Sequence, residues 1–110
     1  MSTATSGKQR EHKVKYLFAE HGWVPIMRAA GSKGPADLLM AHEVHGAALI
    51  QVGTASKTLG PADRARFTQA AHLCGALCLL VTVNRGVVTI HEVTLDVPSK
   101  WLDVTADYLN

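Results

Sequence analysis

The chain has 110 residues, of which 47% are hydrophobic and 18% are charged. This length suits one domain with a single hydrophobic core, and the composition is far from the polar, highly charged balance of disordered chains. The N-terminal residues contain no apolar signal core, and no apolar run reaches the ~18 residues that a membrane span requires. We therefore expect one folded, soluble, cytoplasmic domain.

The basic residues are concentrated in the first part of the chain, although the formal net charge is only +2. Residues 1–66 contain nine Lys or Arg and five Asp or Glu, whereas residues 67–110 contain two and four. Such an asymmetry is compatible with a polyanionic partner. A solvated, lysine-rich helix face would produce the same pattern.

The cysteines and histidines show no metal-binding pattern. Cys74 and Cys78 lie in an apolar stretch without paired ligands at zinc spacing, which predicts buried, reduced thiols. The six histidines include no pair separated by three residues on a helix. We interpret them as surface or capping residues.

The chain begins with a predicted arm and a predicted helix. Residues 1–7 are small and polar, which favours a flexible arm. Residues 8–21 carry Val14 and Phe18 at helical spacing among charged residues, which predicts an amphipathic helix that ends near Gly22.

Three short strands are predicted next. Residues 23–30 are extended in character, and Pro25 within them suits an edge strand. Apolar runs at 37–41 and 47–52, each preceded by a turn, predict two more strands. Tight connections between the three favour a meander.

The remaining part of the chain predicts a helix and a hairpin. Pro61 at a first helical position and Gly75 as a terminator bracket the helix. Residues 77–83 and 87–93 read as strands joined by a turn at 84–86. The order is helix, three-stranded meander, helix and two further strands, which predicts an α/β domain with one mixed sheet over residues 8–94.

The C-terminal segment, residues 95–110, is open to two interpretations. Trp101 and Leu102 are its largest apolar side chains. They could pack back on the core or contribute to a dimer interface.

Two oxygen-bearing side chains are predicted to meet at one end of the sheet. Asp37 stands at the start of one strand and Gln51 near the end of the next, so a meander brings them together. Oxygen ligands of this kind suit hard cations such as Mg²⁺. The chemistry indicated is phosphodiester hydrolysis, in which a metal activates water and stabilises the developing charge.

These residues resemble a known family. Pro35, Ala36 and Asp37, followed by Gln51 and Val52, are similar to the two halves of the PD-(D/E)xK nuclease motif. The preceding RAAGSKG segment and the N-terminal helix with its glutamate resemble the Holliday junction resolvases of archaea and bacteriophages. The resemblance covers roughly residues 7–83 and implies a restriction-endonuclease-like fold.

The resemblance also implies roles for individual residues. Asp37 matches the family's metal-binding aspartate, Gln51 takes the place of the second acidic ligand, and Glu11 matches the helix glutamate that supplements the metal site. Ser32 matches the loop serine near the scissile phosphate. The implied cofactor is Mg²⁺ or Mn²⁺, and the candidate DNA contacts are Lys8, Arg10, Lys13, Arg28, Lys33 and Arg64.

Two positions depart from the family pattern. Gln51 is neutral where a carboxylate is usual, so the site should bind metal less tightly. Gly53 stands where the family has its catalytic lysine, which removes the group expected to position or activate water. Lys57, four residues further on, is a candidate substitute.

Three functional hypotheses follow. The first is a metal-dependent endodeoxyribonuclease that resolves four-way junctions or other branched DNA, acting as a homodimer because two opposed strands must be cut; a phage origin fits its short length. The second is a catalytically impaired branched-DNA-binding protein, which Gly53 favours. The third is an α/β interaction domain in which the motif is coincidental.

Overall fold

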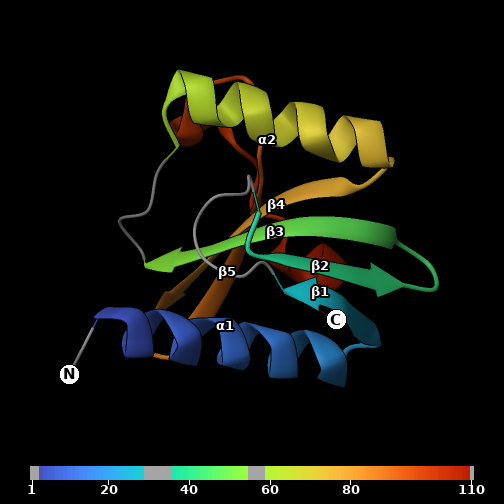
Figure 1. Cartoon of the computed structure of the whole chain (residues 1–110), viewed down its shortest axis with the longest axis vertical. Helices are drawn as coiled ribbons and strands as arrows, with labels where there is room; N and C mark the ends of the chain where they lie inside the picture. Colours follow the sequence, from blue (N-terminus) through green and yellow to red (C-terminus); the bar gives the residue numbers. More distant parts are fainter. Residues whose placement is uncertain (1–2, 29–35, 55–58, 110) are drawn as a thin grey trace.

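The computed structural model describes residues 3–28, 36–54 and 59–109. Figure 1 shows a central sheet with α1 on one face and α2 on the other, so the domain has three layers. The elements in chain order are α1 (Thr3–Glu20), β1 (Trp23–Arg28), β2 (Leu38–His42), β3 (Gly46–Thr54), α2 (Pro61–Cys74), β4 (Leu77–Asn84), β5 (Val87–Glu92), the 3₁₀ helix η1 (Pro98–Lys100) and α3 (Thr105–Tyr108).

The five strands form one mixed sheet in the order β1-β2-β3-β4-β5. Neighbouring strands are antiparallel except for β3 and β4, which are parallel. A parallel pair requires a crossover connection, and α2 provides it. The predicted α/β architecture, with a three-stranded meander, a helix and two further strands in one mixed sheet, is confirmed.

The local signals in the sequence act as expected. Pro61 opens α2, and Gly75 ends it in the left-handed conformation with φ of 64°. In the β4–β5 hairpin, Arg85 and Gly86 both have positive φ, as a two-residue turn matched to the strand twist requires.

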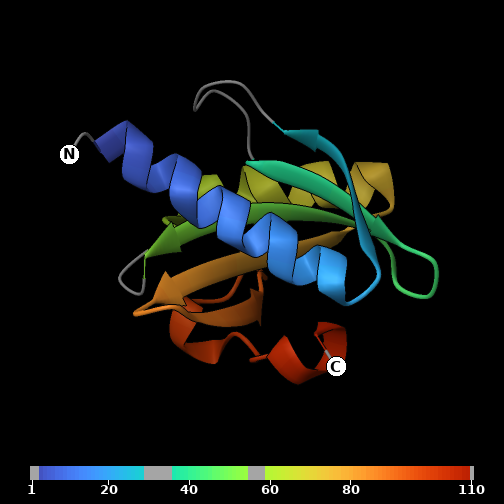
Figure 2. The ribbon, with the colours of Figure 1, turned by 90° about the horizontal axis from the view of Figure 1, so that it is seen from below.

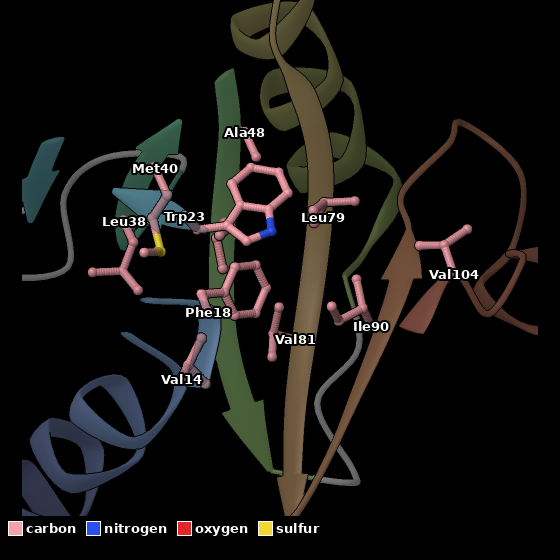
Figure 3. Close-up of a cluster of buried hydrophobic side chains, with 11 residues drawn as sticks. Val14, Phe18, Trp23, Leu38, Met40, Ala48, Leu79, Val81, Ile90 and Val104 are labelled. Atoms are coloured by element: carbon pink, nitrogen blue, oxygen red, sulfur yellow. The ribbon is translucent and has the colours of Figure 1, made fainter. Parts of the chain in front are cut away.

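Two hydrophobic clusters hold the layers together. The cluster between α1 and the sheet includes Val14 and Phe18, which Figure 3 shows against Trp23 and Val81. The cluster under α2 includes Phe67 and contacts from β3, β4 and the C-terminal segment. Because α1 and α2 are each anchored by such a cluster, both helices are held in place on their faces of the sheet.

The C-terminal segment packs back on the core. Trp101 and Val104 are buried, and the Val104 N–H donates to the Ile90 carbonyl at 2.8 Å. Figure 2 shows this segment beside β5. Leu102 is 69% exposed, so it does not share in this packing.

Two sequence-based expectations are wrong. Helix α1 begins at Thr3 rather than at Lys8, so a flexible arm over 1–7 does not describe the backbone of residues 3–7. Small polar residues carry only a modest helix penalty, and a helix that is anchored downstream extends through them. Cys74 is exposed rather than buried, because it lies in the last turn of α2 away from the core.

Cys78 is buried, as expected. Burial, with a smaller effect from nearby Glu92, raises the pKa of its thiol to about 12. The thiol therefore stays protonated and is a poor nucleophile at neutral pH. None of the helices in the described part of the chain is long and apolar enough to span a membrane.

Candidate functional site

Asp37 is fixed at the start of β2 by two hydrogen bonds to β3. Its backbone N–H donates to the Ile50 carbonyl at 2.8 Å, and its Oδ2 accepts the Val52 N–H at 2.8 Å. Leu38 pairs with Ile50 in the antiparallel ladder, so Asp37 lies at the level of Gln51. The strands thus bring the two halves of the motif together at one end of the sheet.

The side chain of Gln51 lies on the α2 side of β3. Ile50 and Val52 contact the cluster under α1, and side chains alternate along a strand, so Gln51 and Gly53 belong to the opposite face. Gly53 is buried and pairs with Thr82 of β4. No amine is present at this position, and the β3 backbone is continuous through it.

Glu11 approaches the same corner of the domain from the other face. Its Oε1 accepts a hydrogen bond from Nε of Arg28, the last residue of β1, at 2.8 Å. A small cleft beside this ion pair is lined by Glu11, His12, Lys15, Arg28 and Leu38. Because Leu38 follows Asp37 directly, Glu11 and Asp37 flank the start of β2.

The side-chain oxygens at this corner are of the kind that hard divalent cations take. The hydrogen bond from the Val52 N–H uses Oδ2 of Asp37 and does not involve Oδ1. Glu11 has a second carboxylate, and Gln51 has an amide oxygen. In residues 3–28, 36–54 and 59–109 there is no group of three or more His, Cys, Asp or Glu side chains placed to hold a metal. The weaker metal binding expected from the neutral Gln51 stays a prediction.

Basic side chains of α1 lie at the surface. Lys8 and Lys13 are exposed on α1, and Arg10 is half-buried. Lys13 Nζ lies 3.6 Å from the point that a Cβ on Gly86 would occupy, so Lys13 reaches the β4–β5 hairpin next to Arg85. One lysine of α1 thus lies close to the turn of this hairpin.

The expectation that Arg64 is an exposed DNA contact is wrong. Arg64 is only 8% exposed, and its Nη1 donates to the Leu59 carbonyl at 2.6 Å. Its Nε is buried without a hydrogen-bond partner among the described residues. Arg64, Phe67 and Ala71 are the buried positions of α2, and their spacing of three and four is the signal that places this arginine on the core face.

Three predicted site residues lie outside the described residues. These are Ser32 and Lys33, between β1 and β2 in the sequence, and Lys57, between β3 and α2. Sequence reasoning missed Lys15 as a residue of the cleft and treated His12 only as a surface or capping residue. Lys15 follows from its position four residues after Glu11 on the same helix, whereas the spacing of His12 from Glu11 does not predict its place in the cleft.

The sequence matches no protein-family model and no curated protein. Among solved structures, the fold is similar to that of Hjc from Archaeoglobus fulgidus, a Holliday junction resolvase from an archaeal hyperthermophile, with a TM-score of 0.66. The chain has the fold of a Holliday junction resolvase. The two proteins share 17% identity over 77% of this chain and 75% of the other, so the likeness extends to most of the resolvase fold in both proteins.

Proposed function

We propose that the protein is a metal-dependent endodeoxyribonuclease that acts on Holliday junctions or other branched DNA. The observation that carries this proposal is the contact between Asp37 and Val52, which joins the two halves of a nuclease motif within a resolvase fold. The exposed lysines of α1 provide sequence-independent attraction for phosphates.

Each part of the site has a distinct role in this proposal. Asp37, Glu11 and Gln51 would hold Mg²⁺ or Mn²⁺, which when bound polarises the scissile phosphate and its attacking water. The bond from the Val52 N–H fixes the orientation of the Asp37 carboxylate. Lys8, Lys13 and Arg28 would contact the DNA backbone and set its position relative to this carboxylate.

A second candidate function is branched-DNA binding without cleavage. Gly53 favours it, because the strand position that carries the family's lysine has no side chain. A protein of this kind would keep the fold and the phosphate-binding surface and lose the group that positions or activates water.

Cleavage of a labelled four-way junction, compared with a matched linear duplex, tests the proposed function. In Mn²⁺ or Mg²⁺ we expect junction-selective cutting, with binding that weakens steeply as salt rises. Binding of the junction without cutting would support the second function. A protein that prefers neither DNA at low salt would contradict both and favour an interaction domain.

We also propose a homodimer, formed through the part of the sheet that α2 leaves uncovered. Val24 pairs with Ala41, and Met27 pairs with Leu39, so these side chains share the face opposite α1. Val24 and Met27 are 57% and 66% exposed. A two-fold contact through these exposed apolar side chains would direct both basic α1 helices outward, whereas a contact through α1 would oppose like charges.

Met27→Lys should convert a dimer into a monomer, because two lysine charges would be brought into an apolar interface. Light scattering, in which one chain accounts for 11.8 kDa, measures the change. Val87→Lys is the matched control, since Val87 is 64% exposed at the opposite edge of the sheet. A monomeric wild type, or equal effects of the two substitutions, would rule out this interface.

A further inference from the structure

The carboxylate of Glu11 is already paired with a basic side chain, Arg28, in the described structure. Its Oε1 lies 2.8 Å from Arg28 Nε, and the side chains are 21% and 42% exposed, respectively. Lys15 and His12 line the same cleft. A single carboxylate is therefore surrounded by basic side chains, which is an unfavourable arrangement for a divalent cation and a favourable one for a phosphate.

We propose that Arg28 exchanges Glu11 for a DNA phosphate, and that this exchange frees Glu11 for the divalent cation. The inference rests on the proposed function. In the DNA-free protein the guanidinium neutralises Glu11 and repels the cation. When a DNA phosphate binds at the exposed side of the Arg28 guanidinium, Arg28 and Lys15 contact it, and the Glu11 carboxylate turns to the cation beside Asp37.

The chemistry of the two partners supports this exchange. A guanidinium presents a planar fork of donors that matches phosphate oxygens as well as it matches a carboxylate. Arg28 is exposed enough for a phosphate to reach it, and it ends β1 beside Leu38, the residue that follows Asp37. A partly exposed ion pair of this kind changes an equilibrium constant by about two- to fivefold, so it is weak enough to exchange.

Exchange predicts that metal and DNA bind cooperatively. Arg28 and the divalent cation compete for the Glu11 carboxylate. If DNA draws Arg28 away, DNA must raise metal affinity, and metal must raise DNA affinity by the same factor. Without Arg28 the cation meets no competitor, so its affinity is higher before DNA arrives. The coupling between the two ligands should then be smaller.

The first measurement is a calorimetric titration of the DNA-free protein with Mn²⁺. We expect Arg28→Gln to bind Mn²⁺ about two- to fivefold more tightly than wild type. Lys15→Gln removes a charge from the same cleft without removing the partner of Glu11, and should have a smaller effect. Arg66→Gln breaks a pair of the same 2.8 Å length with Asp63 on α2 and should have none.

The second measurement is the anisotropy of a fluorescent four-way junction, at constant ionic strength, in EDTA and in Ca²⁺. The gain in affinity from Ca²⁺ should be about two- to fivefold larger for wild type than for Arg28→Gln. Glu11→Gln should also lose this gain, because it removes the carboxylate that the exchange releases.

The outcomes separate this inference from the proposed function. A wild type that binds the junction with the same Ca²⁺ gain as Arg28→Gln overturns the exchange and leaves the proposed function standing. An Arg28→Gln protein that binds Mn²⁺ no more tightly than Lys15→Gln also overturns the exchange. A wild type that does not bind the junction in either buffer overturns the proposed function and the exchange with it.

Discussion

Gly53→Lys should raise the rate of junction cleavage by about 10²- to 10⁴-fold, the range that a positioned acid–base side chain contributes. Gly53 lies two residues after Gln51 on β3, the spacing of the motif's lysine, and its position in the β3–β4 ladder is fixed by pairing with Thr82. The described glycines with positive φ are Gly22, Gly46, Gly75 and Gly86, so a side chain at Gly53 meets no conformational penalty of that kind. Single-turnover cleavage of a labelled four-way junction in Mn²⁺ measures the rate.

Gly53→Ala is the matched control, because it adds a side chain at the same buried position without an amine. It should leave the rate within a few-fold of wild type. A Gly53→Lys protein that binds the junction and cuts it no faster than Gly53→Ala would contradict the interpretation of this position as the catalytic one.

The same assay decides the role of Lys57. If wild type cuts the junction, Lys57→Ala should remove most of that activity, because Lys57 is the substitute amine that the sequence offers after β3. Unchanged cleavage by Lys57→Ala would eliminate this substitution.

The order of elements was predictable because each one carries a strong local signal. The buried pair Val14 and Phe18 repeats with the helical period, Pro61 and Gly75 delimit α2, and the turn at Arg85 and Gly86 closes a hairpin. The helix start at Thr3 was not predictable, because residues 3–7 lack a periodic pattern and follow the helix only through propagation from the anchored part.

The candidate site was predictable along the strands and less so between the layers. Asp37 and Gln51 follow from strand order, since consecutive antiparallel strands determine which residues are neighbours. The pair between Glu11 and Arg28 depends on how α1 crosses the sheet, and no local pattern specifies that angle. Arg64 was misplaced although a local pattern was available. Its charge suggested a surface position, whereas its spacing from the buried apolar residues of α2 places it on the core face.

Asp37→Asn should lower the rate of junction cleavage by about 100- to 1,000-fold. The substitution is made in the wild-type protein if that protein cuts the junction, and otherwise in Gly53→Lys. A bound cation supplies several kcal/mol of stabilisation to the transition state, and each ~1.4 kcal/mol is worth tenfold in rate. The substitution removes the negative charge and keeps an amide oxygen, which can still accept the Val52 N–H. The fold should therefore survive, and the thermal midpoint should change little.

Asp63→Asn is the appropriate control, because Asp63 is an exposed carboxylate, paired with Arg66 on α2. Its rate should equal that of the parent protein. The pair of variants separates two roles of Asp37. If Asp37→Asn loses its rate while keeping junction affinity and thermal midpoint, the carboxylate acts on the cation and the reacting phosphate. If the rate persists, Asp37 serves only to join β2 to β3, and the nuclease interpretation of this corner of the sheet is wrong.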